Sequence, residues 1–326
     1  MKITMAHGSG GKASAELMGQ IFGKHFSNDI LDQMEDAAVL QVNGKIAFST
    51  DSFVVTPIVF KGGDIGKLSI CGTVNDLLMM GAEPKYISCG FILEEGLEIE
   101  TLEKIVCSMG EMAREAGVKI VAGDTKVVEG NGGLYINTSG IGLIREGRHV
   151  SAANCKPGDA IILSGNLGDH HACILSARMN MDNNIKSDSA CLADITSALF
   201  DKGIRVSTMR DVTRGGLGTV LNEIGEQSRC SIEINETSIP MDEEVAAFAE
   251  ILGLEPLYMA NEGKMIAIVH GEDADRALEA IRGTVNGVHA RIIGVAKDGA
   301  GVKMVTRLGG TRVVDVLYGE GLPRIC

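Results

Sequence analysis

Short apolar runs alternate along this chain with longer segments in which apolar residues recur every three or four positions. The short runs are typical of buried β-strands, and the longer segments are typical of amphipathic helices. The pattern therefore predicts a mixed α/β protein (α+β, with mixed sheets). Predicted strands are 46–50, 87–93, 119–122, 135–144, 160–163, 265–269 and 290–295, and the clearest predicted helices are 97–116, 213–227 and 272–282.

A polar, turn-rich stretch at 151–159 separates two halves of the chain. With 326 residues, 45% of them hydrophobic, the length favours about two domains. We predict an N-terminal domain at 1–150, a second domain at 151–317 and a glycine-rich mobile tail at 318–326. The segment 180–188 is polar without periodicity, which predicts an exposed loop.

The composition narrows the possible functions. The formal charge of −13 argues against a nucleic-acid binder or an anionic-membrane binder, because both need a basic surface. The 42 glycines, with only 4% aromatic residues, suit loops that approach a ligand closely. The first residues show no signal-peptide pattern, and no apolar run approaches the ~20 residues that cross a bilayer, so we expect a soluble cytoplasmic protein.

The eight cysteines show neither a C-x-x-C motif nor a close Cys/His cluster of zinc-site spacing. Cys71 and Cys89 lie in apolar runs and are predicted to be buried and reduced. Cys326 is the last residue and follows a glycine-rich stretch. An extended tail of eight residues reaches about 25 Å, so this thiol could visit a distant pocket. The alternative is that Cys326 is only the residue at which the chain ends.

A glycine-rich loop, His7-Gly8-Ser9-Gly10-Gly11-Lys12, precedes a helical pattern that begins near Ala13. Its backbone N–H groups could face an anion at the helix N-terminus. It is not a P-loop, because Ala6 stands where the first glycine belongs and Ala13 replaces the serine or threonine. A plain turn explains this loop as well as a phosphate cradle does.

Acidic residues gather at the ends of predicted strands and helices in the first half. Each alone could be a cap or turn residue, but together they could hold Mg²⁺, which takes a few carboxylates with phosphates and water. Lys126 follows Asp124 by two residues and would share its side of a continuing strand, where it could meet a phosphate or form a surface salt bridge. The residues in question are Glu35, Asp36, Asp51, Asn75, Asp76 and Asp124.

Two further carboxylates stand out in the second half. Asp211 precedes a glycine pair and a predicted helix, which it could simply N-cap. Glu262 precedes the strand 265–269, where a carboxylate can act as a base or a metal ligand. His170 and His171 begin a helical pattern, and adjacent residues cannot share one helix face, which argues against a metal-binding pair.

In this order the motifs resemble the aminoimidazole ribonucleotide synthetase (PurM-like) superfamily, which includes selenophosphate synthetase and thiamine monophosphate kinase. Adding the C-terminal residues narrows the resemblance to the HypE family of hydrogenase maturation proteins. The motifs are His7 to Gly11, Glu35-Asp36-Ala37-Ala38-Val39, Ser49-Thr50-Asp51-Ser52, Thr73-Val74-Asn75-Asp76, Gly123-Asp124-Thr125-Lys126, Arg210 to Leu217, Asn261-Glu262-Gly263-Lys264 and Pro323-Arg324-Ile325-Cys326.

The resemblance implies a two-domain subunit whose N-terminal domains pair in a homodimer around ATP. In the matching positions, Asp36, Asp76 and Asp211 would bind Mg²⁺. The nucleotide site would comprise Asp51, Asn75, Asp124 and Lys126, with Gly8, Ser9, Gly10 and Gly11 over the nucleotide or the tail. Two residues depart from the family pattern: Glu35 stands in place of aspartate, and His171 stands where glycine is expected.

The resemblance also implies a reaction. A partner carbamoyltransferase, HypF, places a carbamoyl group on Cys326, and ATP drives its dehydration to a thiocyanate. The cyano group then becomes a ligand of the NiFe hydrogenase iron, which the HypC–HypD scaffold carries. Cys326, Glu262 and Lys126 would be the catalytic residues, with Glu262 as proton acceptor.

Two alternatives stay open at this stage. The first is another ATP-dependent enzyme of the superfamily that acts on a free small molecule. Selenophosphate synthetase is disfavoured, because it needs a reactive residue near the N-terminus and the first cysteine here is Cys71. The second is a nucleotide-dependent scaffold whose tail only docks, which would tolerate Cys326→Ser.

Overall fold

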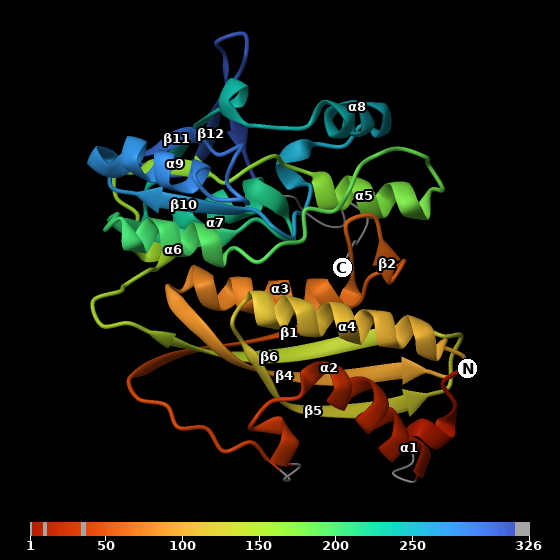
Figure 1. Cartoon of the computed structure of the whole chain (residues 1–326). Helices are drawn as coiled ribbons and strands as arrows, with labels where there is room; N and C mark the ends of the chain where they lie inside the picture. The colour runs from red at the N-terminus through yellow and green to blue at the C-terminus, as the bar shows by residue number, and fades with distance from the viewer. Residues whose placement is uncertain (1, 9–11, 34–36, 317–326) are drawn as a thin grey trace.

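The computed structural model describes residues 2–8, 12–33 and 37–316, and Figure 1 shows two sheets, one above the other. Several predicted site residues lie outside the described residues: Ser9, Gly10, Gly11, Glu35, Asp36 and Cys326 with the tail from 318. The α/β class with mixed sheets is confirmed.

The first sheet has the strand order β1 (Lys45–Phe53), β6 (Leu134–Ile144), β4 (Ala82–Glu94) and β5 (Lys119–Val128). β6 is antiparallel to both of its neighbours, while β4 and β5 are parallel, so β1, β4 and β5 end at the same side of the sheet. Helices α3 (Ile65–Met79) and α4 (Ile99–Glu115) cover one face, and α3 lies between this sheet and the second domain (Figure 1).

The N-terminal segment forms one helical stretch from 12 to 26, which confirms the helix predicted after the glycine loop. It comprises α1 (Lys12–Leu17), the π-helical turn η2 (Met18–Gly23) and α2 (Lys24–Phe26). The short 3₁₀ turns η1 (Met5–Gly8) and η3 (Leu31–Gln33) flank it. The ring of Phe22 packs 4.8 Å from the ring of Phe91 on β4, which anchors the segment to the sheet. A two-stranded ribbon, β2 (Val59–Phe60) and β3 (Gly63–Asp64), leads into α3.

The second sheet has seven strands, and every neighbouring pair is antiparallel except β12 with β9. The strand order is β13 (Thr311–Val314), β12 (Val302–Val305), β9 (Ser231–Asn235), β11 (Arg291–Lys297), β7 (Ala160–Leu163), β10 (Met265–Val269) and β8 (Val206–Asp211).

The centre of this sheet is buried on both faces. In β10, Met265, Ala267 and Val269 join a large core shared with the first domain, whereas Ile266 and Ile268 join a second core. The second core packs under α7 (Gly216–Ser228), and α6 (Ala193–Asp201) and α9 (Ala274–Arg282) cover the opposite face. The remaining elements are α5 (Asp169–Arg178), α8 (Glu243–Leu252) and the 3₁₀ turns η4 (Ala152–Asn154), η5 (Glu236–Ser238), η6 (Pro256–Tyr258) and η7 (Gly271–Asp273).

All seven predicted strands are present, and Cys71 and Cys89 are buried as predicted, at 0% and 2% exposure. Two predictions were wrong. Asp51 and Asp124 lie inside β1 and β5 and not after them, because both strands run further than their apolar cores. The segment 180–188 is irregular, but it is not simply exposed, since Ile185 is buried and the Asp188 side chain is 2% exposed. Among the described residues, no helix is long and apolar enough to cross a membrane.

Candidate active site

Four carboxylates from four separate elements meet at the junction of the two domains. Asp51 comes from β1, Asp76 from α3, Asp211 from the end of β8, and Glu262 from the turn before β10. They line a small cavity of about 80 Å³, together with Ser52, Phe53, Gly72, Thr213 and Arg214. The sequence pattern predicted each of these acids separately, and the fold brings them together.

Hydroxyl groups orient two of these carboxylates. Ser49 Oγ donates to Asp76 Oδ2 at 2.5 Å, and Thr73 Oγ1 donates to Asp51 Oδ2 at 3.3 Å. Ser49 and Asp51 share one face of β1 because they are two residues apart, and Thr73 and Asp76 share one face of α3 because they are three apart. The spacing therefore makes the helix and the strand present their acids to each other.

The acids carry more negative charge than their surroundings balance. Burial, and then the charge of Asp76, raises the pKa of Asp51 to about 6 and that of Asp211 to about 7. Burial raises the pKa of Glu262 well above its usual range, and nearby acids add to this effect. Arg214 acts against the shifts at Asp51 and Glu262 but does not cancel them. Such a site favours an incoming cation.

The donor set fits Mg²⁺ by its chemistry, because carboxylate and hydroxyl oxygens are hard ligands. Within the described ranges, no group of three or more His, Cys, Asp or Glu side chains is arranged to hold a metal alone. Asp36, the third predicted ligand, lies outside the described residues. Mg²⁺ usually takes one or two carboxylates with water and substrate phosphates, and Asp76 and Asp211 match that number of carboxylates.

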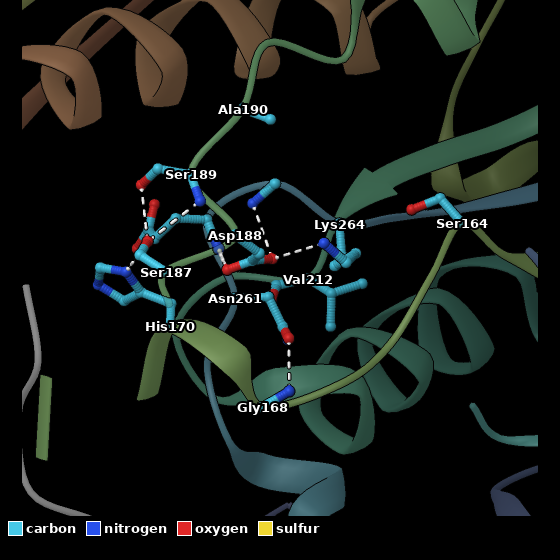
Figure 2. A network of polar contacts seen from close by, with 12 residues as sticks. Ser164, Gly168, His170, Ser187, Asp188, Ser189, Ala190, Val212, Asn261 and Lys264 are labelled. Carbon is cyan, nitrogen blue, oxygen red and sulfur yellow. Dashed lines mark hydrogen bonds and ion pairs between the residues drawn. The ribbon is translucent and has the colours of Figure 1, made fainter. Parts of the chain in front are cut away.

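The turn that carries Glu262 is held by polar contacts on both sides (Figure 2). The Asn261 side chain is fully buried, donates to the carbonyls of Val212 and Met259 at 2.9 and 3.1 Å, and accepts from Gly168 N–H at 2.7 Å. On the other side, the Asp188 carboxylate accepts from the backbone N–H groups of this turn. Glu262 is 6% exposed.

The interpretation of Asp211 as an N-cap is wrong. Asp211 is the last residue of β8, and the N-cap of α7 is Gly215, whose φ is +83°. Gly216 follows at φ +63°, and a Cβ there would lie 2.5 Å from the carbonyl oxygen of Leu257. The glycine pair thus makes the tight turn that leaves Asp211 free to face the cavity.

Asn75 is the neighbour of Asp76 but does not line the cavity. It is 3% exposed, donates from Nδ2 to the Ala190 carbonyl at 3.0 Å, and accepts at Oδ1 from Leu192 N–H at 2.9 Å. In the described structure its amide therefore joins α3 to the second domain.

Asp124 and Lys126 lie on the other face of the first sheet. Across the sheet, Asp124 on β5 is paired with Gly90 on β4, Gly90 with Asn137 on β6, and Asn137 with Ser52 on β1. Directly paired residues point to the same face of a sheet, so the Asp124 side chain lies on the face of Ser52 and not on that of Asp51. The two also stand at opposite edges, three strand spacings or roughly 14 Å apart. Lys126 does share the side of Asp124, as predicted, and their ion pair lowers the pKa of Asp124. One chain therefore does not bring this pair to the acidic cavity.

Gly8 packs against β5, where a Cβ would lie 2.9 Å from both the backbone nitrogen and the Cβ of Val127. Only glycine allows this close approach. Gly8 thus lies near the edge that carries Lys126, and not near Asp51.

Sequence reasoning missed the residues that support the cavity. Thr73, Ser49 and Arg214 stand inside recognised motifs but carry no spacing signal of their own. Asp188 lies in a polar run without periodicity, so no sequence pattern marks it as buried.

Comparison with known proteins agrees with this architecture. Residues 34–144 match the model of the AIR synthase related protein N-terminal domain, and residues 156–307 match that of the C-terminal domain. The chain is 47% identical to the carbamoyl dehydratase HypE of Azotobacter vinelandii, covering 99% of this chain and 97% of that protein. It is 48% identical to that of Cupriavidus necator, covering 100% and 95%.

The chain belongs to the HypE family of carbamoyl dehydratases, within the AIR synthase related superfamily. A solved HypE structure in complex with ATP superimposes with a TM-score of 0.95 at 47% identity, covering 99% of both chains. A HypE chain in a HypE–HypF complex superimposes with a TM-score of 0.82 at 46% identity, covering 92% of this chain and 99% of that chain.

Proposed function

We propose that this protein is an ATP-dependent carbamoyl dehydratase that converts an S-carbamoyl group on its own Cys326 to a thiocyanate, the cyanide donor for the NiFe hydrogenase iron. The observation that carries this proposal is the convergence of Asp51, Asp76, Asp211 and Glu262 in one cavity of a HypE-family chain that also contains Cys326.

The chemistry requires removal of an amide oxygen, which is a poor leaving group. Transfer of the γ-phosphoryl group of ATP to the carbamoyl oxygen turns that oxygen into part of a phosphate leaving group. Loss of phosphate and of both nitrogen protons then forms the C≡N bond. The balance is Cys–S–CO–NH₂ plus ATP giving Cys–S–C≡N plus ADP and phosphate, with the two protons carried by the phosphate or by a base.

In this proposal Asp36, Asp76 and Asp211 hold Mg²⁺, which when bound offsets negative charge on the phosphates. Lys126 supplies a point positive charge to a phosphate oxygen, and Asp51, Asn75 and Asp124 with Gly8 to Gly11 form the nucleotide site. Glu262 accepts a proton from the carbamoyl nitrogen. Its burial keeps water away from the reacting group, and its raised pKa makes it a strong base once it is ionised.

We further propose a homodimer that forms through the face of the first sheet opposite α3 and α4. This face carries exposed apolar side chains, with Phe48 66% and Ile46 and Ile92 46% exposed. A partner chain that covered it would bury the patch and lie against the face that carries Asp124 and Lys126. This arrangement would let Asp124 and Lys126 serve the acidic cavity of the partner, which they do not reach within their own chain.

The proposal also includes partner proteins, a cellular compartment and domain boundaries. HypF would carbamoylate Cys326, as the HypE–HypF complex of a relative suggests, and the HypC–HypD scaffold would accept the cyano group in the cytoplasm. The proposed domains are 1–150 for ATP binding and dimerisation, 151–317 for the second α/β unit and 318–326 for the reactive tail.

Intact mass spectrometry with C-terminal peptide mapping tests the proposal. The protein is mixed with ATP, Mg²⁺, carbamoyl phosphate and HypF, and Cys326 should first gain a carbamoyl group and then lose one water only when ATP is present. Cys326→Ser should show neither change. Steady ATP turnover on an added metabolite with an unmodified Cys326 would indicate a small-molecule enzyme instead, and full maturation activity of Cys326→Ser would indicate a docking scaffold.

A further inference from the structure

Asp188 is the centre of a network of polar contacts (Figure 2) that includes the backbone of Glu262. Its side chain is 2% exposed, so its charge is held almost entirely by protein groups. Oδ1 accepts from Glu262 N–H at 3.1 Å, and Oδ2 accepts from Gly263 N–H at 3.1 Å. Lys264 Nζ lies 3.2 Å from Oδ2. The carboxylate therefore engages three consecutive residues of the Glu262 turn.

The segment 188–190, which contains Asp188, also binds the carbonyl group of Glu262. The carbonyl of Glu262 accepts from Ala190 N–H at 3.4 Å, so both backbone polar groups of Glu262 bind the 188–190 segment. A Cβ at Gly263 would overlap the backbone oxygen of Asp188, so this approach requires glycine. On the far side, Val212 N–H donates to the Lys264 carbonyl at 2.9 Å. The turn is thereby fixed between the 188–190 segment and the end of β8.

We propose that Asp188 is a positioning residue for the dehydration reaction, because its carboxylate fixes the backbone from which Glu262 projects into the acidic cavity. The inference rests on the proposed function of Glu262 but adds a residue that does not line that cavity. Asparagine fits the same space but offers only one acceptor oxygen. One of the two backbone N–H groups would then face an N–H₂ donor, which turns the Glu262 peptide. A shift of about 1 Å at a reacting group can cost about 100-fold in rate.

The test compares Asp188→Asn with the wild type in single turnovers of HypF-carbamoylated protein with ATP and Mg²⁺. The maximal rate of water loss at Cys326 should fall by about 10- to 100-fold, with the ATP concentration at half-maximal rate changed less than about 3-fold. Asp273→Asn is the matched control. Asp273 is also buried and paired, with Arg205 Nε at 2.7 Å and Arg276 Nη1 at 2.9 Å, but it lies on the turn before α9. Its variant should unfold more easily and keep the wild-type rate in the folded protein.

A double-mutant cycle separates positioning from general destabilisation. If Asp188 acts through Glu262, Asp188→Asn should cost nothing further in a Glu262→Gln background. An equal loss in both backgrounds would overturn the proposal, and so would a rate for Asp188→Asn within 3-fold of wild type.

Amide hydrogen exchange tests the contact without activity. The Glu262 and Gly263 amides should exchange at least 10-fold faster in Asp188→Asn than in the wild type and in Asp273→Asn. Unchanged exchange would overturn the proposal. If wild-type protein loses no water at Cys326, the proposed reaction fails, and this exchange measurement still decides the role of Asp188.

Discussion

His171, the third residue of α5, is a histidine that the fold keeps neutral. It is 2% exposed, its Nδ1 accepts only a long 3.5 Å hydrogen bond from Ala260 N–H, and its Nε2 has no hydrogen-bond partner among the described residues. Burial lowers its pKa from 6.5 to about 4, and the charges of His170 and Arg178 add to this effect. A buried histidine at this position therefore adds an acid-sensitive group to the core.

This burial predicts a pH dependence of stability. The unfolded chain takes up the His171 proton below pH 6.5, whereas the folded protein resists it until about pH 4, so stability falls as pH falls through this range. At pH 5 the loss should be about 2 kcal/mol relative to pH 7.5. Urea unfolding at the two pH values should show that His171→Gln lacks this loss of stability. His289 is exposed, so His289→Gln should lose as much stability between the two pH values as the wild type. An unchanged pH dependence in His171→Gln would contradict this account.

At the scale of elements, the apolar pattern predicted strands better than it predicted this protein's central helix. α3 is buried on nearly every side, so its apolar residues follow no single stripe and the helical period is hidden. In the second sheet, strands β8, β9, β12 and β13 were missed because their short sequences mix polar and apolar residues. Of these, β8 and β13 are the edge strands of the sheet. A buried helix and an edge strand both depend on neighbours that the local sequence does not contain.

The local sequence is also insufficient to predict which acids lie together in the site. Asp76 and Asp211 were selected from their motifs, but whether two acids lie close together depends on the face of the sheet to which each strand directs its side chains. For Asp124 that face follows from a strand that continues to Val128, six residues beyond the predicted end. Neither the register nor the pairing partner of β5 can be read from its sequence.

Asn75 on α3 predicts how firmly the two domains are joined. Asn75→Ala would leave the Ala190 carbonyl and the Leu192 N–H without partners in a buried place, which should cost roughly 2 to 4 kcal/mol. Asn222→Ala is the control. Asn222 also makes two hydrogen bonds, both donated by Nδ2, to the carbonyls of Gly218 and Val314, but it makes them within one domain and nearer to water. Urea unfolding measures the free energy of unfolding of both variants. Equal losses in the two variants would show that the hydrogen bonds of Asn75 contribute no more to stability than those within one domain.

For the whole molecule, the apolar face of the first sheet predicts a dimer that depends on Phe48. A glutamate at this position would place a charge within the proposed interface, so Phe48→Glu should be monomeric at micromolar concentration in analytical ultracentrifugation and should lose ATP turnover. Ile251→Glu on α8 is the matched control, since Ile251 is 74% exposed on the second domain. A Phe48→Glu protein that stays dimeric would exclude this face.

The faces of the first sheet also predict how the two chains share their active sites. Asp124 stands at the opposite edge and on the opposite face from Asp51, so a nucleotide that touches both must bridge two chains. Asp124→Asn and Glu262→Gln should each lower ATP turnover by about 100-fold on their own. When the two variants are mixed and allowed to exchange subunits, half of the dimers are mixed, and each mixed dimer has one site with both native residues. Activity should therefore recover to about a quarter of the wild-type value. If each site were built within one chain, every site in the mixture would lack one residue, and no activity would return.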